Sequence, residues 1–526
     1  MNHRILFPLM FLMAGVVVLS GSPWGSNTQP VSWAPSDDIT RWHVHADITW
    51  VEANEAAHLA GGSLNGYTIF APIRSTTTYL INNSGEVVHT WESDYNPRHS
   101  VYLLENGNLL RTASDNNPTF QGGGAGGRVQ EIDWDGSVLW DFEYSTNQYC
   151  LHHDVEILPN GNVLMIAWER KTVAEAIVAG RNPDLLPSEG LWPDHIIEVE
   201  PTGVTGGNVV WEWHVWDHLI QDYDPTKENY GVVADCPELV DVNYVVNPSN
   251  PGADWNHINS IDYNEEFDQI LLSINAFREI WVIDHSTTME EAASHTGGNS
   301  GKGGDVLYRW GNPQTYRAGE ADDQRFFHQH DAQWIEPGLL GEGNILVFNN
   351  GLGRPSGLYS SVEEIEPPVD NDGSYSLTLG CPYGPEEQTW IYTAENPTDF
   401  FSPNLSGAQR LPNGNTLVCN GANGIFFEVT PEKETVWEYE NLFPNPFQNG
   451  VFKVRRYAPD YPGLAAWRAD VNRDGIVDTL DIITVAEAFG SSPSDPNWNL
   501  MTDLVEDAVI DVLDLTFLTK NFGETV

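Results

Sequence analysis

Short apolar segments separated by turn residues recur along the chain. Three of these phrases share an Asn-Gly-Asn turn between two apolar runs, and they lie at Leu103–Leu110, Leu158–Met165 and Leu411–Val418. Looser forms lie at Glu266–Ser273 and Gly341–Phe348. Asn-Gly dipeptides readily adopt the positive φ values that a tight β-hairpin turn requires. Each phrase therefore predicts two adjacent antiparallel strands.

A second phrase follows the first, and it contains a strand, an acidic turn and another strand that carries a tryptophan. Val129–Phe142 and Phe426–Tyr439 are examples. Together the two phrases make units of about four strands, which is typical of a β-propeller, whereas a β-sandwich would not repeat one phrase. Six such units begin near Leu64, Ser100, His152, Trp255, His328 and Ser402.

The repeat predicts an all-β fold, a six-bladed β-propeller over residues 63–465. Val451–Tyr457 is expected to be a closing strand that pairs with an N-terminal strand and so hides an exposed edge. The long insertions after His214 and after Asp284 are predicted to be loops.

The N-terminus has the pattern of a signal peptide. His3 and Arg4 precede the apolar run Ile5–Ser20, and small residues follow it. This run is shorter than the roughly 20 residues that a membrane span needs, although a membrane anchor remains the alternative. We therefore expect residues 1–25 to be a signal peptide, residues 26–62 to be an N-terminal segment, and the mature chain to be secreted, periplasmic or extracellular, without a membrane span.

Composition narrows the possible partners. Lys+Arg number 24 and Asp+Glu number 75, so the net charge is -51, which excludes a nucleic-acid partner. Hydrophobic residues make up 40% and aromatic residues 11% of the chain, which is too many for a disordered acidic protein. Cys150, Cys236, Cys381 and Cys419 form no CxxC motif, so three disulfide pairings and four free thiols all remain open.

The C-terminal region from residue 468 to residue 526 has a different character. Residues 470–481 have the spacing of a calcium-binding loop, with Gly475 at the sharp turn. The oxygen ligands expected for Ca²⁺ are the side chains of Asp470, Asn472, Asp474, Asp478 and Asp481 and the carbonyl of Ile476. A second copy at 503–514 has Val505 and Ala508 at two key positions, so we expect it to bind Ca²⁺ weakly or not at all.

This duplicated loop and helix pattern resembles a type I dockerin, a small α-helical calcium-loop domain. The resemblance implies a cohesin-bearing protein as a possible partner. The alternative is an acidic, solvated tail.

Three sequence phrases that contain histidine are the candidates for a functional site. Cys150–Val155, Asp254–Ser260 and Phe326–Trp334 each open a repeat unit. Because the first strand of every propeller blade lines the central channel, His153, His257 and His330 are expected to converge there. Taken alone, each histidine would usually be a buried core residue whose hydrogen bonds are satisfied.

Converging neutral imidazoles suit two kinds of chemistry. One ring can act as a nucleophile while the others polarise the electrophile and protonate the leaving group. Alternatively, a metal ion could be bound by His152, His153, His257, His328 and His330. Asp154 and Asp331 adjoin two of these histidines, but strand alternation should point them the other way.

The histidine phrases H-H-D-V-x-x-L-P-N-G-N, D-W-x-H-x-N-S and Q-H-D-A resemble the bacterial arylsulfate sulfotransferase family. Glu279–Thr288 and Phe348–Arg354 carry the same resemblance, which runs from about Gly66 to Gly463. It implies a six-bladed propeller and a transfer that uses neither 3′-phosphoadenosine nor another cofactor. In that reaction a sulfuryl group moves from a phenolic sulfate donor to a phenol acceptor through a sulfated histidine.

The resemblance also implies residue roles. His330 would be the nucleophile, while His153 and His257 would contact the sulfuryl or bridging oxygens, one of them as the acid for the departing phenolate. Asn259 would donate a hydrogen bond to the sulfuryl group.

The sequence departs from the family at one position, because the family has an arginine where this chain has Asn275. Strand alternation would turn Arg278 to the opposite face, so we expect the compensating charge to come from Arg354. Without such a cation the channel would bind sulfate more weakly, accept another donor or lack activity. The alternative function is a non-catalytic secreted propeller that binds glycans or proteins and is displayed through the dockerin-like domain.

Overall fold

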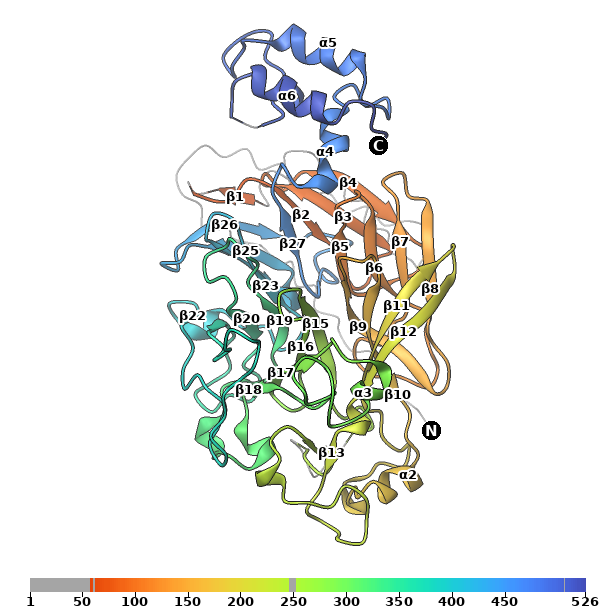
Figure 1. Cartoon of the computed structure of the whole chain (residues 1–526). Helices are drawn as coiled ribbons and strands as arrows, with labels where there is room; N and C mark the ends of the chain where they lie inside the picture. The colour runs from red at the N-terminus through yellow and green to blue at the C-terminus, as the bar shows by residue number, and fades with distance from the viewer. Residues whose placement is uncertain (1–56, 60–61, 246–251, 506) are drawn as a thin grey trace, which may run out of the picture. The chain divides into compact units, whose positions relative to one another are not determined.

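A computed structural model of the chain describes residues 57–59, 62–245, 252–505 and 507–526 (Figure 1). The expected signal peptide, residues 1–25, and nearly all of the segment 26–62 lie outside the described residues. In the part that is described, no helix has both the length and the apolar character needed to cross a membrane.

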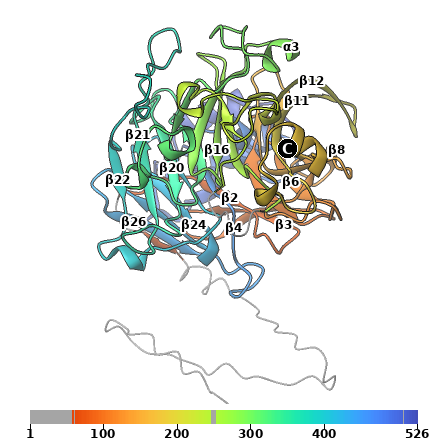
Figure 2. The same ribbon diagram turned by 90° about the horizontal axis from the view of Figure 1, so that it is seen from below.

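The described strands form six antiparallel sheets that follow one another in chain order (Figures 1 and 2). Blade 1 contains β27 (Arg455–Tyr457), β2 (Tyr67–Phe70), β3 (Thr77–Asn82) and β4 (Val87–Glu92). Blade 2 contains β5 (Pro97–Leu103), β6 (Leu109–Ser114), β7 (Gly127–Ile132) and β8 (Val138–Glu143). Blade 3 contains β9 (Tyr149–Ile157), β10 (Val163–Glu169), β11 (Asp194–Thr202) and β12 (Gly206–His214).

The second half of the ring has the same design. Blade 4 contains β15 (Ile258–Asn264), β16 (Gln269–Ile274), β17 (Glu279–Asp284) and β18 (Tyr308–Trp310). Blade 5 contains β19 (His330–Trp334), β20 (Ile345–Asn349), β21 (Ser361–Ile365) and β22 (Trp390–Tyr392). Blade 6 contains β23 (Gly407–Arg410), β24 (Thr416–Asn420), β25 (Ile425–Val429) and β26 (Thr435–Glu440), to which β1 (Ala57–Leu59) is added. The prediction of a six-bladed β-propeller is confirmed.

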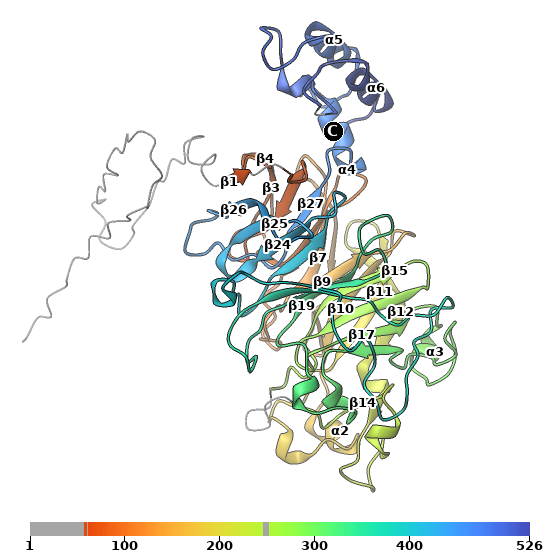
Figure 3. The same ribbon diagram turned by 90° about the vertical axis from the view of Figure 1, so that its left-hand side faces the viewer.

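The ring closes as expected through β27, which pairs antiparallel with β2 (Figure 1); β27 is seen from another side in Figure 3. Arg456 on β27 also reaches the neighbouring blade 6. Its Nη1 lies 2.5 Å from Oε2 of Glu428, and its guanidinium lies 4.1 Å from the ring centroid of Trp437. The C-terminal end of the propeller sequence is therefore tied to both the first and the last blade.

The repeated tryptophan of the second phrase joins each blade to the next. In every blade the indole nitrogen of a tryptophan on the outer antiparallel strand donates to a backbone carbonyl of the following blade, at 2.7 to 3.0 Å. The six donors are Trp91, Trp140, Trp213, Trp310, Trp390 and Trp437, and the last one donates to Asn83 of blade 1. Because a buried indole N–H needs a partner, this closed ring explains why the phrase carries tryptophan and not phenylalanine.

The two long insertions contain more structure than predicted. The one after His214 contains β13 (Leu219–Ile220) and β14 (Val240–Asp241), which pair in parallel, and the one after Asp284 contains α3 (Met289–Ala292). A further helix, α2 (Val173–Val178), follows β10. Capping boxes begin both helices, at Thr172 and at Thr288.

The C-terminal region is helical. It contains α4 (Pro462–Ala469), α5 (Thr479–Ala488) and α6 (Val512–Lys520), and a small apolar core that includes Val485 and Leu518 holds the last two together. Leu464 of α4 is buried with Ile69 of the propeller core.

The four cysteines are free thiols, of which Cys150 and Cys419 are buried.

Candidate active site

The structure brings the three predicted histidines together. His153 lies on β9, His257 immediately precedes β15, and His330 begins β19. The ring centroids of His153 and His257 are 4.6 Å apart. The ring of Phe452 lies 5.9 Å from the rings of both His153 and His330, so it links the third histidine to the other two.

Local backbone irregularities turn these rings toward one another. His153 and His257 have backbone φ values of 54° and 55°, which residues other than glycine rarely adopt. The register of each inner strand shifts beside its histidine phrase, between β9 and β10, between β15 and β16, and between β19 and β20. Such β-bulges redirect single side chains, and they occur often next to active sites.

Hydrogen bonds fix the tautomer of His330. Its Nδ1 lies 2.7 Å from Oδ1 of Asn350 and 3.1 Å from the carbonyl oxygen of His328. Both partners can only accept, so Nδ1 carries the proton and Nε2 carries the lone pair. Burial lowers the pKa of His330 to about 4. The ring is therefore neutral near pH 7, which is the state a nucleophile needs.

His257 has the opposite electrostatic character. Its Nδ1 lies 2.5 Å from Oδ2 of Asp254, whose Oδ1 accepts a hydrogen bond of 2.9 Å from the indole of Trp168. Burial lowers the pKa of His257, but the charge of Asp254 and its hydrogen bond outweigh burial and raise this pKa above its usual value. His257 can therefore carry a proton beside a neutral His330.

His153 ends a short chain of hydrogen bonds. Its Nδ1 lies 2.8 Å from Nδ1 of His152, and Nε2 of His152 lies 2.7 Å from Oδ1 of Asp194. Burial lowers the pKa of both histidines and raises the pKa of Asp194, which favours the uncharged form of each group. When Asp194 is protonated, it donates to His152, and His152 then donates to His153. This direction leaves a proton on Nε2 of His153, which becomes a hydrogen-bond donor.

Asn275 and Arg278 both bind His328 beside the cluster. Oδ1 of Asn275 accepts from Nδ1 of His328 at 3.1 Å, and Nη2 of Arg278 donates to Nε2 of the same ring. Arg278 is 8% exposed, and its Nη1 has no hydrogen-bond partner among the described residues. A buried guanidinium with a spare donor is suited to holding an anion.

The expectation that Arg278 faces away is wrong. Strand β16 ends at Ile274, and a turn follows in which the amide of Arg278 donates to the carbonyl of Asn275 at 3.2 Å. Arg278 has a φ of 64°, so the strand alternation on which the expectation rested does not apply to it.

Arg354 and Asn259 have other partners. The guanidinium of Arg354 bonds Ser361 at 2.8 Å, lies 3.5 Å from Glu363 and stacks on Tyr359. None of these contacts joins Arg354 to the histidines. The amide nitrogen of Asn259 donates to the carbonyl of Gln329 at 2.8 Å, so one of its two protons is already used.

The aspartates next to the histidines face the other end of the channel, as strand alternation predicted. Asp154 lies 2.7 Å from Nζ of Lys453, and Asp331 lies 2.8 Å from Nη2 of Arg455. These ion pairs separate the histidines from a cavity of about 640 Å³ at that end. Asp154 and Asp331 therefore neutralise the closing segment and do not orient the histidine rings.

Comparison with known protein families shows which family the chain belongs to. The sequence model of the Arylsulfotransferase (ASST) family matches residues 67–444, which is most of the chain. The chain belongs to this family.

A curated relative supports the assignment to the arylsulfotransferase family. Arylsulfate sulfotransferase AssT of Escherichia coli O6:H1 (strain CFT073) is 24% identical over 335 residues, which cover 57% of this chain and 50% of that protein. The match thus spans half the length of the relative.

Solved structures resemble the chain only distantly. A Bacteroides caccae protein of unknown function has 13% identity and a TM-score of 0.41, covering 75% of this chain and 99% of that one. Virginiamycin B lyase from Staphylococcus aureus has 9% identity and a TM-score of 0.33, covering 73% of this chain and 87% of that one. Likeness at this level adds nothing to the functional argument.

Several residues near these histidines were not predicted from the sequence. His99 lies with its ring centroid 4.9 Å from that of His153, and burial lowers its pKa to about 3. Gly124 has a φ of 80°, and a Cβ there would fall 2.2 Å from the ring of His153. The glycines within Gln121–Gly127 were a usable signal, since only glycine allows the backbone to lie this close to the ring of His153.

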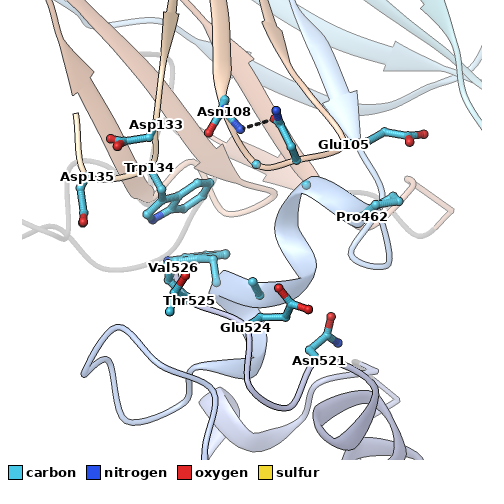
Figure 4. A pocket seen from close by; sticks show the side chains of 15 residues that line it. Glu105, Asn108, Asp133, Trp134, Asp135, Pro462, Asn521, Glu524, Thr525 and Val526 are labelled. Atoms are coloured by element: carbon cyan, nitrogen blue, oxygen red, sulfur yellow. Dashed lines mark hydrogen bonds between the residues drawn. The ribbon is translucent and has the colours of Figure 1, made fainter. Parts of the chain in front are cut away.

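A separate cavity of about 620 Å³ lies near the C-terminus (Figure 4). Its lining includes Glu105, Asp133, Asp135 and Glu524, and it contains no histidine. A lining this acidic is unsuited to a sulfate ester, because like charges repel. The histidine channel remains the candidate site.

In the loop of residues 470–481, backbone amides donate hydrogen bonds to two buried carboxylates. The carboxylate of Asp470 accepts from the amides of Asp474 and Gly475, and that of Asp481 accepts from the amides of Asn472 and Asp478. Asp470 and Asp481 are 2% and 0% exposed, and neither forms an ion pair within the described part of the chain. Buried carboxylates without a cationic side chain fit Ca²⁺. Asp503 and Asp514 repeat this arrangement in the second loop.

Proposed function

We propose that this protein transfers a sulfuryl group from a phenolic sulfate ester to a phenol through a sulfated His330. The observation that carries the proposal is the state of His330, which is buried, neutral and held at Nδ1 by Asn350. Its Nε2 is the basic atom, and a protonated His257 belongs to the same cluster. The family match supports the reaction class.

Each half-reaction balances with these groups alone. In the first, Nε2 of His330 attacks sulfur, the bond between sulfur and the phenolic oxygen breaks, and His257 gives its proton to the departing phenolate. In the second, the acceptor phenol returns a proton to His257, its oxygen attacks sulfur, and the nitrogen–sulfur bond breaks. The covalent step divides one difficult transfer into two easier ones.

Donors around the sulfuryl group supply the electrostatic part of the mechanism. The Nε2 proton of His153 and the unpartnered Nη1 of Arg278 can bond its non-bridging oxygens, and Asn259 has one spare amide proton. Fixed donors of this kind stabilise charge that develops in the transition state. Arg278 thus takes over the anion-binding task of the arginine that Asn275 replaces, in a protein whose net charge of -51 otherwise repels an anionic donor.

Intact-mass measurement after exposure to 4-nitrophenyl sulfate tests the proposal. In the absence of an acceptor we expect one sulfuryl adduct, mapped to His330 by peptide sequencing, and its loss when a phenol is added. His330→Ala should give no adduct, whereas His295→Ala, which changes an exposed histidine, should behave as the wild type does. An adduct on another residue, or equal turnover by wild type and His330→Ala, would refute the mechanism.

A non-catalytic propeller is the second candidate, and it is favoured by Asn275, which stands where the sequence resemblance implies an arginine in the family. It predicts that an aryl sulfate or a glycan binds to the channel without turnover. Calorimetric binding together with the absence of any adduct would establish it.

We propose further that the chain is exported and that its C-terminal region is a calcium-loaded dockerin-like module for a cohesin-bearing partner. The duplicated carboxylate loops support this, as do the exposed apolar side chains of Leu480, Ile483, Val512 and Leu513 on α5 and α6. A cohesin panel should retain the chain in Ca²⁺ and release it with a chelator. Asp470→Ala should abolish retention. If the chain is retained equally well after chelation and in Asp470→Ala, the proposal is contradicted.

A further inference from the structure

A second cluster of ligand-type side chains lies outside the histidine channel. One ligand atom from each of His218, His295 and Asp305 lies within 4.8 Å of the other two. Within the described residues this is the only group of three histidine, cysteine, aspartate or glutamate side chains that meets this distance. The channel histidines do not meet it.

The cluster joins the two long insertions. His218 follows β12 in blade 3, while His295 and Asp305 lie between β17 and β18 in blade 4. Neighbouring contacts hold the two insertions together, because the indole of Trp213 donates to the carbonyl of Gly304 at 2.7 Å and the ring of Trp213 stacks on His218.

The hydrogen bonds of His218 bring two acceptor atoms together. Its Nε2 lies 2.8 Å from the carbonyl oxygen of Ala292, which can only accept, so Nε2 carries a proton. In the neutral ring Nδ1 then presents a lone pair, yet it lies 2.8 Å from Oδ1 of Asp305. Two acceptors at this distance require either a proton or a metal ion between them.

The surroundings favour a metal ion. The same Oδ1 of Asp305 lies 2.7 Å from Nδ1 of His295, so one carboxylate oxygen faces two imidazole nitrogens. His218 is 0% exposed and Asp305 is 5% exposed, and the ion pairs of Asp305 in the described part of the chain are with these two histidines alone. A histidine whose second nitrogen donates to a backbone carbonyl is the usual form of a metal ligand.

We propose that His218, His295 and Asp305 bind a zinc ion that fastens the two insertions to each other, with water in the fourth position. Two imidazoles and one carboxylate suit Zn²⁺ better than Ca²⁺ or Mg²⁺, which prefer oxygen ligands. A tetrahedral zinc places neighbouring donor atoms about 3.4 Å apart, so the donors must separate by roughly half an ångström. His295 is 58% exposed on its loop and has room to move.

The expected role of this zinc is structural. Asp305 lies beyond the end of β17 that is remote from Arg278, since β17 begins at Glu279 beside the channel and ends at Asp284. Removal of the ion should therefore loosen the insertions without changing the sulfuryl-transfer chemistry. This proposal does not depend on the proposed function.

Zinc content of the full chain tests the proposal. The protein is treated with a chelator, loaded with ZnCl₂ in the presence of Ca²⁺, desalted and examined by elemental analysis and by anomalous diffraction at the zinc edge. We expect about one zinc per chain, with the anomalous peak among His218, His295 and Asp305. His295→Ala changes an exposed side chain and is expected to weaken zinc affinity by roughly tenfold or more.

Matched variants separate this site from the channel. His330→Ala should retain the zinc, and Asp305→Asn should lose it. An anomalous peak at the channel histidines, unchanged zinc affinity in His295→Ala, or no retained zinc in the wild type would each overturn the proposal. The last result would identify the cluster as a hydrogen-bonded group of side chains without a metal ion.

Discussion

Oδ1 of Asn350 lies 2.7 Å from Nδ1 of His330, and the amide nitrogen of the same side chain donates to the carbonyls of Ser402 and Leu405 at 2.8 and 2.9 Å. The two carbonyls fix which end of the amide faces His330, so the orientation of Asn350 determines the tautomer of the ring. The proposed nucleophile therefore depends on a residue from a different part of the blade.

Loss of this amide should impair the chemical step. In Asn350→Ala the ring can rotate or change tautomer, and we expect kcat to fall by about one to two orders of magnitude with little change in KM. Asn350→Asp is the informative companion, because a carboxylate beside Nδ1 raises the pKa of His330 and should shift the acid limb of the pH profile upward. A profile identical to wild type in both variants would show that Asn350 does not position the ring.

Arg278 should carry the recognition of the sulfate group. A charge-assisted hydrogen bond contributes about 1.5 to 3 kcal/mol, so Arg278→Ala should lower kcat/KM for an aryl sulfate by about 10- to 100-fold. Arg278→Lys should recover part of this loss. Placing an arginine next to His328 with Asn275→Arg in the Arg278→Ala background is expected to rescue activity. Steady-state kinetics that do not change in Arg278→Ala would refute the role.

The pH dependence of the first half-reaction should be bell-shaped. His330 must be neutral, and its lowered pKa of about 4 sets the acid limb, below which activity falls. His257 must be protonated, and because its pKa is raised above the usual value the basic limb should lie above pH 6.5. Asp254→Asn removes the charge that raises the pKa of His257, so the basic limb should move to lower pH while the acid limb stays in place. Pre-steady-state release of 4-nitrophenol measures both limbs.

Folding stability should depend on the protonation of His285, which joins blades 3 and 4. Burial lowers the pKa of His285, but hydrogen bonds to Asp268 and Glu198 outweigh burial and raise it to about 9. A pKa raised above the unfolded value of about 6.5 stabilises the folded chain fully below pH 6.5, and this stabilisation is lost as the pH rises to 9 and above. The loss should be at most about 3 kcal/mol. Urea unfolding across this pH range checks it, and His285→Gln should remove this part of the slope.

The ring of tryptophan hydrogen bonds predicts a different result for two similar substitutions. Trp437→Phe deletes the indole donor at 2.8 Å from the carbonyl of Asn83, and we expect the free energy of unfolding to fall by about 1 to 2 kcal/mol. Trp192 is the matched control, because its buried indole nitrogen has no partner among the described residues. Trp192→Phe should therefore lower the free energy of unfolding by less than Trp437→Phe does, as measured by denaturant unfolding. Equal effects would mean that volume and not the hydrogen bond determines the cost.

The local pattern was enough to predict how the propeller is built. The Asn-Gly turns describe hairpins whose formation depends on neighbouring residues alone. The repetition of these hairpins and of the tryptophans then indicated a ring of blades with a closing strand at Val451–Tyr457. Since equivalent positions of a repeat lie at equivalent places in a ring, the shared phase of His153, His257 and His330 also predicted their convergence. Asp154 and Asp331 point away from the histidines as predicted, although the backbone there departs from regular alternation, with a φ of 53° at Asp331.

Only the tertiary structure decided which groups surround these histidines. Arg278 binds His328 because β16 ends early and the chain turns with a positive φ, which alternation along a strand does not describe. Asn350 and Asp194 contact the rings of His330 and His152 from other strands and loops, and His218 meets Asp305 through two insertions from different blades. Periodicity records which face of its own strand a side chain occupies, whereas partners contributed by other blades depend on how the whole ring packs.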